Sequence, residues 1–175
     1  MKKSRLRDNI ESLILVIVIS LMIRQFIIYP SRIEDGEMSP TLQEGDFIWS
    51  YSLAFGLPNP FKPEKRWAAR SPEKNELVIF ELPGEPGVLL ARRVMAVEGD
   101  KVEIENSEPL IVPPGYFFAK TDNFSLVNNA AQGEGLVPTR QLRGKIWMIW
   151  FSINSKGDTK SDGSINWKRL FKTVN

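Results

Sequence analysis

Two absences limit the side chains that could do chemistry near neutral pH. The 175-residue chain contains no cysteine and no histidine. It can therefore have no cysteine nucleophile, no disulfide, no thiolate or imidazole metal site and no Ser-His-Asp triad. Acid–base catalysis would need a carboxylate or a lysine with a strongly shifted pKa. We expect no metal and no cofactor.

The most distinctive polar segment is IEDGEMSPTLQEGDFIW, residues 33–49. Turns select Asp, Gly, Ser and Pro, so the segment could be a simple spacer. The run from Met38 through Ser39 and Pro40 to Leu42, followed by Gly45-Asp46, is more particular than a spacer requires. We treat it as a candidate active-site loop.

An apolar segment precedes this loop. Residues 10–28, IESLILVIVISLMIRQFII, would span about 28 Å as a helix, which is close to the thickness of a bilayer core. Lys2, Lys3, Arg5 and Arg7 precede it, and flanking positive charge predicts a cytoplasmic N-terminus. A cleavable secretory signal is the alternative, but no small-x-small cleavage site follows. We predict a cytoplasmic segment 1–9, an uncleaved transmembrane helix 10–29 and an extracytoplasmic domain 30–175.

The rest of the chain has the pattern of short strands. Gly99-Asp100 is typical of a hairpin turn, and residues 53–74 and 154–164 are an expected insertion and an expected loop. The tail INWKRLFKTV fits a short helix or a last strand. The fold class predicted is mainly β, an antiparallel sheet with one N-terminal helix. The predicted strands are 46–52, 77–82, 88–97, 101–105, 116–119 and 145–152.

Two aromatic features remain open. Trp147 and Trp150 are three residues apart, so on a regular strand they face opposite sides, and either a β-core with an aromatic rim or an interfacial anchor fits. Segment 59–75 mixes aromatic and basic residues, and a solvated insertion is favoured over a nucleic-acid or lipid-headgroup surface. The net charge of +2 gives a nucleic-acid partner little support.

Five ordered segments resemble type I signal peptidases, which are membrane-anchored serine endopeptidases with a Ser-Lys dyad. The resemblance is collinear over nearly the whole chain and implies their β fold. The segments are IRQFIIYPSRIEDGEMSPTLQEGDFIW, RSPEKNELVIFELP, RRVMAVEGDKVEI, VPPGYFFAKTDN and GLVPTRQLRGKIWMIWFS.

Carried over position by position, the resemblance puts three replacements in the active site. The nucleophile position is Glu37, the general-base position is Arg92, and the oxyanion-donor position is Asp35. Deprotonating an arginine at pH 7 would cost roughly 7 kcal/mol or more. A carboxylate is a poor nucleophile toward amides, and an ionised Asp35 would repel an oxyanion. We expect no catalysis by the family mechanism, and we expect Glu37 and Arg92 to form an ion pair.

Three further expectations follow. Ser39 is the fallback nucleophile, although using it breaks the register of the motif. A substrate groove is expected near Met38, Pro40 and Arg93. Arg93 is expected to lack its usual carboxylate partner, because the later Ser and Asp positions of the family's Gly-Asp-Asn box read Val127 and Asn129 here.

The sequence therefore predicts a signal-peptidase-like, single-pass protein of the inner or plasma membrane that is catalytically inactive. Its expected partners are the membrane and signal peptides, preproteins or an active signal peptidase, with no nucleic acid. The alternative is an active signal peptidase that uses a relocated nucleophile such as Ser39.

Overall fold

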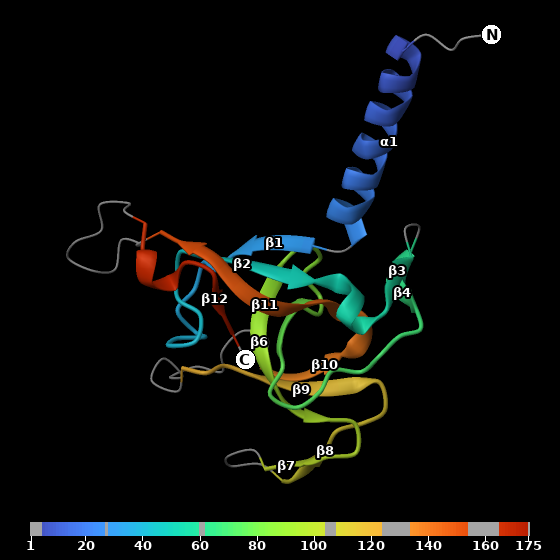
Figure 1. The fold of residues 1–175 in the computed structure, drawn as a ribbon. Coiled ribbons are helices and arrows are strands. Elements are labelled where there is room, and N and C mark those ends of the chain that lie inside the picture. The colour runs from blue at the N-terminus through green and yellow to red at the C-terminus, as the bar shows by residue number, and fades with distance from the viewer. Residues whose placement is uncertain are drawn as a thin grey trace.

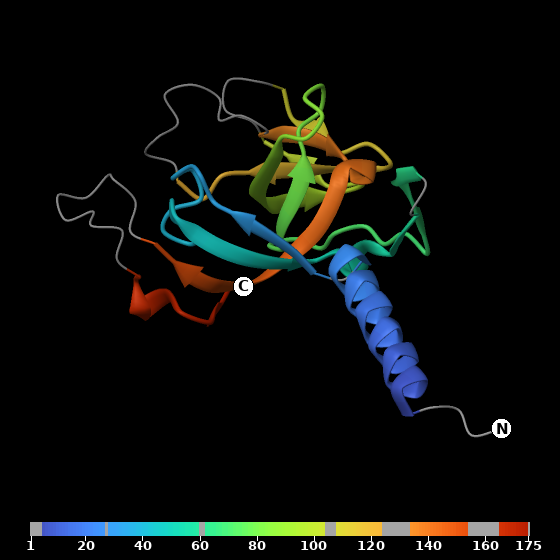
Figure 2. The same cartoon turned by 90° about the horizontal axis from the view of Figure 1, so that it is seen from above.

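The structure is a computed structural model that describes residues 5–26, 28–59, 62–103, 108–123, 134–153 and 165–174. Helix α1 (Arg5–Phe26) projects away from a β domain that holds the rest of the described chain (Figures 1 and 2). The strands are β1 (Ile28–Arg32), β2 (Asp46–Tyr51), β3 (Leu57–Asn59), β4 (Lys62–Trp67), β5 (Leu77–Glu81), β6 (Leu89–Val97), β7 (Lys101–Val102), β8 (Leu110–Ile111), β9 (Tyr116–Lys120), β10 (Gly135–Pro138), β11 (Leu142–Ser152) and β12 (Lys172–Thr173). The described residues also form the short 3-10 helices η1 (Ser52–Phe55), η3 (Thr139–Gln141) and η4 (Trp167–Arg169).

One large antiparallel sheet organises the domain, which confirms the predicted mainly β fold. Its strand order is β1-β2-β11-β5-β6-β9-β10, with β12 paired to β11. Two small sheets, β3-β4 and β7-β8, lie outside it. In Figure 1 the β7-β8 hairpin is at the end of the domain farthest from α1.

Strand β5 is buried on both faces. Its sequence LVIFE has four successive buried residues, where a strand with one solvated face would alternate. Leu77 and Ile79 belong to one core cluster, whereas Val78 and Phe80 belong to the other. The sheet thus has a core on each side of β5, and an inward-facing side chain on the neighbouring strand β6 is enclosed by protein.

Five of the predicted strands are present with shifts of one to three residues in their ends. The strand predicted over 101–105 is observed over 101–102, and residues 104–105 lie outside the described residues. Three other segments differ from the expectation. Helix α1 runs from Arg5 to Phe26 and residues 28–29 belong to β1, so the helix predicted over 10–29 begins and ends too far along the chain. Strand β1 was not predicted from the sequence, and it contains Pro30. It is an edge strand, where a proline is tolerated. The tail forms both η4 and β12.

The hairpin expected at Gly99-Asp100 is only half correct. The turn is present, since Gly99 has φ +86° and the Asp100 N–H donates to the Val97 carbonyl. The flanking strands do not pair with each other, because β6 pairs with β9 and β7 pairs with β8. The expected insertion over 53–74 contains η1 and the β3-β4 pair, and the expected loop over 154–164 lies outside the described residues.

Two irregularities in β11 change the alternation of its side chains. The register to β2 shifts between Ile146 and Met148 and again between Ile149 and Phe151. As a result Ile146 and Ile149 both enter the same core cluster, while Trp147 and Trp150 are both exposed. The prediction that the two tryptophans face opposite sides is wrong, because it assumed a regular strand.

No helix within the described residues is both long enough and apolar enough to cross a membrane. The described face of α1 is nevertheless strongly apolar, with nine large hydrophobic side chains about half exposed. These are Ile10, Leu13, Ile14, Leu15, Val16, Ile17, Val18, Ile19 and Leu21.

Candidate functional site

Arg92 is the buried centre of the site. It lies on β6 opposite Val78 of the two-faced strand β5, and its side chain is 0% exposed. Neighbouring residues of a strand point to opposite faces, so Arg92 turns into the core and Arg93 turns to the other side. A buried guanidinium needs a charged partner and further acceptors, and one acceptor is the Ala91 carbonyl at 2.7 Å.

Glu37 supplies the charged partner. Its carboxylate accepts a hydrogen bond from Arg92 Nη2, so the ion pair expected from the motif register is confirmed. Asp35 lies near the same guanidinium, with Oδ2 at 4.0 Å from Arg92 Nη1. The positions that correspond to nucleophile, base and oxyanion donor therefore form one charge cluster around a buried cation.

The 33–49 loop is held in place by the segment after β9. Asn123 donates from its backbone N–H to the Glu37 carbonyl at 3.0 Å and from Nδ2 to the Gly36 carbonyl at 3.2 Å. Thr41 Oγ1 donates to Asp122 Oδ2 at 2.6 Å. These contacts fix the backbone on both sides of Met38, which is itself fully buried.

Asp35 also binds the backbone at residue 37. Its Oδ1 accepts the backbone N–H of Glu37 at 3.1 Å. An N–H at the nucleophile position is a natural oxyanion donor in acyl transfer, because it lies beside the atom where the negative charge develops. Here that N–H already donates to a carboxylate.

Burial is the main reason that the pKa of Glu37 lies above its ordinary value. The charge of Arg92 opposes this rise, while repulsion from Asp35 and Glu134 adds to it. The carboxylates of Asp35 and Glu134 therefore disfavour the ionised form of Glu37, and contact with Arg92 stabilises that form.

Ser39, the fallback nucleophile, has no base in contact. It is partly exposed, and its hydroxyl makes no hydrogen bond with any described residue. The described part of the chain also holds no group of three or more acidic residues that could bind a metal ion.

Arg93 has a carboxylate partner, Asp122, that the sequence analysis did not name. The expected loss of its usual partner concerns Val127 and Asn129, which lie outside the described residues. Arg93 Nε donates to Asp122 Oδ1 at 2.8 Å and its Nη2 donates to Asp122 Oδ2 at 2.7 Å. Burial alone would raise the pKa of Asp122, but the hydrogen bonds from Arg93 and Thr41 and the charge of Arg93 lower it below its usual range. Asp122 thus ties β6 to the 33–49 loop.

A second two-point ion pair was missed by sequence reading. Arg169 of η4 donates to Asp46 Oδ1 at 2.9 Å and Oδ2 at 2.5 Å, and its Nη2 also donates to the Thr41 carbonyl at 2.9 Å. Asp46 further accepts the Gln43 N–H at 2.8 Å. Both ionised side chains are buried, and the only sequence signal was the Gly45-Asp46 pair at the end of the loop motif.

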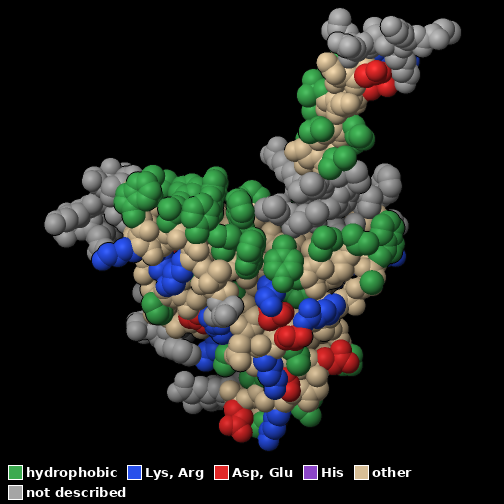
Figure 3. Space-filling view, viewed as in Figure 1, with side chains coloured by type: hydrophobic (Ala, Val, Ile, Leu, Met, Phe, Trp, Pro, Cys, Tyr) green, Lys and Arg blue, Asp and Glu red, His purple; other side chains and the backbone are tan. Residues whose placement is uncertain are grey.

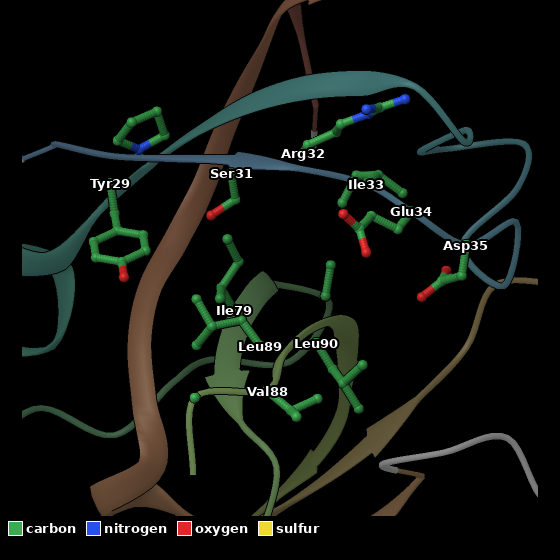
Figure 4. Close-up of a pocket in the computed structure, with 13 residues that line it drawn as sticks. Tyr29, Ser31, Arg32, Ile33, Glu34, Asp35, Ile79, Val88, Leu89 and Leu90 are labelled. Atoms are coloured by element: carbon green, nitrogen blue, oxygen red, sulfur yellow. The ribbon is translucent and has the colours of Figure 1, made fainter. Parts of the chain in front are cut away.

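A cavity of about 470 Å³ lies beside the Glu37–Arg92 pair, between β1 and the first residues of β6 (Figure 4). Figure 4 shows Ser31 and Asp35 directed toward this space, with Leu89 and Leu90 on the opposite wall, whereas Arg32 points away. None of Met38, Pro40 and Arg93, the expected groove residues, lines it. Met38 is in the core, and Arg93 is bound to Asp122.

Both walls of the cavity have a free backbone edge within the described residues. Strand β1 is at the edge of the sheet and pairs only with β2. Strand β6 pairs with β5 over residues 89–93, and its pairing with β9 begins at Arg93. Along residues 89–91, no described strand pairs with the side of β6 that faces away from β5. An extended peptide placed here could pair with either wall.

Comparison with known proteins places the chain among signal peptidases. Residues 6–112 match the family described as signal peptidase, peptidase S26. A 97-residue match to Signal peptidase I of Pseudomonas aeruginosa is 33% identical and covers 55% of this chain but only 34% of that protein. Longer matches reach Signal peptidase I of Rickettsia typhi, at 24% identity over 91% of this chain and 86% of that protein, and of Bacillus licheniformis, at 26% over 87% and 92%.

Proposed function

Because the chain belongs to the signal peptidase family, peptidase S26, we propose that it is a catalytically silent member that binds extended peptide segments without cutting them. The observation that carries this proposal is the ion pair between Glu37 and the buried Arg92. A guanidinium cannot take a proton from an attacking group at neutral pH. The side chain at the attacking position is a carboxylate that the same guanidinium holds.

The open groove supports the binding half of the proposal. Strand addition needs an unpaired backbone edge and pockets for alternate side chains. The cavity between β1 and residues 89–91 has both, with the apolar side chains of Ile79, Leu89 and Leu90 lining it. The ligand class is an extended peptide, and the family likeness favours signal peptides or preproteins.

The test uses the full chain purified in detergent, with a preprotein and a fluorescent signal peptide as probes. We expect saturable peptide binding and no cleavage on overnight incubation. Ser31→Trp, which fills the groove, should weaken peptide binding at least tenfold. Arg32→Trp is the matched control, because Arg32 points away from the cavity, and it should retain binding within about twofold (Figure 4).

Cleavage of the preprotein by the unmodified chain would contradict the proposal that the protein is catalytically silent. Loss of that cleavage in Ser39→Ala would assign the activity to Ser39. Absence of peptide binding would remove the binding half. A further arm asks whether the dyad alone is missing. Cleavage gained by Glu37→Ser combined with Arg92→Lys would show that only the dyad is missing, because a buried lysine can titrate near neutral pH and a serine can attack.

We also propose that the protein works at a membrane surface. Apolar side chains gather on the face of the domain from which α1 rises (Figure 3). Exposed tryptophans and phenylalanines are typical of the interface between water and lipid. The exposed apolar residues of β11 and the C-terminal segment are Trp147, Trp150, Ile165, Trp167 and Phe171.

Insertion of the apolar part of α1 into the bilayer, with residues 1–9 in the cytoplasm and the β domain outside it, is the topology that we propose. The positive residues ahead of the helix and its exposed apolar side chains support it. Protease protection in sealed inner-membrane vesicles tests it. Accessibility of the β domain from the cytoplasmic side would contradict the proposed orientation.

A further inference from the structure

A small cavity away from the groove is rich in arginine. It has a volume of about 170 Å³ and lies between η1, the segment after β4 and η3. Its polar lining consists of Arg66, Arg70, Ser71, Thr139 and Arg140, and the fully buried ring of Phe55 lies on its apolar side. One water occupies about 30 Å³ of liquid volume, so the cavity has room for a small polyatomic ion.

Arg66 is partly buried there without a carboxylate partner. Its Nη1 donates to the Ser52 carbonyl at 2.8 Å, the Gly56 carbonyl at 3.1 Å and the Ser52 hydroxyl at 3.2 Å. Its Nη2 donates to the carbonyls of residues 142 and 143 at 2.8 and 3.1 Å. All these acceptors are neutral, and no carboxylate of the described chain acts on its charge. Burial first, and then repulsion from Arg143, lower the pKa of Arg66.

The carboxylates around the cavity already have cationic partners. Glu73 binds Arg70, Glu81 binds Arg143, and Glu76 Oε1 is 2.7 Å from Lys145 Nζ and 3.8 Å from Arg70 Nη2. Arg140 is exposed at the rim and makes no ion pair or hydrogen bond with any described residue. Among the side chains that the structure describes, no carboxylate pairs with Arg66 or Arg140, so the described lining of the cavity has an excess of positive charge.

We propose that this cavity binds a phosphate group, either as a free phosphate or phosphate monoester or as the headgroup of an anionic phospholipid. Guanidinium groups donate pairs of hydrogen bonds to phosphate oxygens, and they suit phosphate better than a point charge does. Arg140 and Arg70 line the cavity from different segments, and the Ser71 hydroxyl adds a further donor. The bound anion would supply the counter-charge that Arg66 lacks.

The position of the cavity makes a lipid headgroup a reasonable source. Ile28, which follows α1 after one residue, pairs with Tyr51, and η1 begins at the next residue, Ser52. Figure 1 shows the coil after β2 beneath the lower end of α1. A helix held in a bilayer would thus bring this cavity close to the headgroups.

In the first experiment, the full chain in detergent is titrated with inorganic phosphate at low ionic strength, and calorimetry measures the binding. Arg140→Gln should weaken phosphate binding at least tenfold. Lys101→Gln, which removes one exposed positive charge in the distant β7-β8 hairpin, should change it by less than twofold (Figure 1). Glu73→Gln should strengthen binding a few-fold, because it frees Arg70 from its competing carboxylate.

The second experiment separates the two sources with vesicles of phosphatidylcholine alone and with added phosphatidylglycerol. If Arg140→Gln loses affinity only for the anionic vesicles, the ligand is a headgroup. If Arg140→Gln has a lower affinity for inorganic phosphate but binds both kinds of vesicle like the unmodified chain, the ligand is a soluble phosphate. No saturable phosphate binding together with unchanged vesicle binding would overturn the proposal. Equal losses in Arg140→Gln and Lys101→Gln would do the same, because they indicate diffuse attraction.

Discussion

The Asp122 carboxylate connects two parts of the site, since it accepts two hydrogen bonds from Arg93 on β6 and one from Thr41 in the 33–49 loop. Its folded-state pKa lies below the usual range, so its stabilisation is complete above about pH 4 and is lost as the pH falls through the folded-state pKa. Asp122→Asn should lower the free energy of unfolding by about 1.5–3 kcal/mol at pH 7.

Urea unfolding at a series of pH values checks this. The difference between the unmodified chain and Asp122→Asn should shrink as the pH is lowered below about 4. Glu103→Gln, an exposed carboxylate in the β7 region, is the control and should show no such dependence. A difference that stays constant down to pH 2.5 would mean that the charge of Asp122 does not stabilise the fold.

The Glu37–Arg92 pair makes a separate prediction about stability. Arg92 is fully buried whereas the Glu37 side chain is 29% exposed, so the cost of removing Glu37 depends on how well Asp35 can replace it. Glu37→Gln should destabilise the fold by about 2–3 kcal/mol, at or just below the range for breaking a buried pair. Glu37→Leu combined with Arg92→Met should recover most of this loss, because the double change leaves no buried charge. Chemical denaturation measures both, and a neutral Glu37→Gln would contradict the pairing.

At this scale the sequence predicted the Glu37–Arg92 pair but missed the Arg93–Asp122 pair. The first follows from motif register, because two replaced positions that share a site must balance their charges. The second was sought further along the chain, at Asn129. Arg93 is opposite Lys120 in the β6-β9 register, so Asp122 lies only two residues further on and within reach of its guanidinium.

The loop between β1 and β2 and the C-terminal segment form a single unit through Arg169. This arginine reaches Asp46 and the Thr41 carbonyl, and all the atoms involved are largely buried. Arg169→Ala should lower the free energy of unfolding by about 3–5 kcal/mol, because it leaves Asp46 as a buried charge with only the Gln43 N–H as a donor.

Lys168→Ala is the matched control, since the neighbouring Lys168 is exposed, and it should change stability by less than about 0.5 kcal/mol. Thermal unfolding and limited proteolysis of the C-terminal segment measure the effect. Equal stability of the two variants would mean that the Asp46–Arg169 pair does not hold the segment.

Strand positions were predictable from alternation and from buried apolar runs, as LVIFE in β5 shows. Strand pairing was not predictable, because the Gly99-Asp100 turn connects strands of different sheets. The irregularities in β11 were also hidden, since no residue in KIWMIWFS marks the shift that brings Trp147 and Trp150 out together. Long-range pairs such as Asp46–Arg169 depend on where the chain returns, which local pattern does not contain.

At the scale of the whole molecule, we consider the exposed apolar residues of β11 and the C-terminal segment together with α1. We call the surface formed by Trp147, Trp150, Ile165, Trp167 and Phe171 the aromatic face. Trp150 packs against Trp49 at 5.3 Å between ring centroids, and the Phe171 N–H donates to the Trp150 carbonyl, so the C-terminal segment extends the face formed by β11. The ring contact restrains Trp150 in the protein alone, which favours the proposed contact with lipid. Less side-chain entropy is then lost on membrane contact.

The face should therefore contribute to lipid binding beyond the contribution of α1. Trp147→Gln combined with Trp150→Gln removes two exposed rings, which at partial insertion correspond to about 1–3 kcal/mol, or roughly ten- to hundredfold weaker binding. Ile111→Gln, which changes an exposed apolar residue on β8 at the end of the domain farthest from α1, is the control and should retain binding. Vesicle flotation with phosphatidylcholine, where charge plays no part, measures the three proteins. Equal flotation of the double variant and the unmodified chain would assign membrane contact to α1 alone.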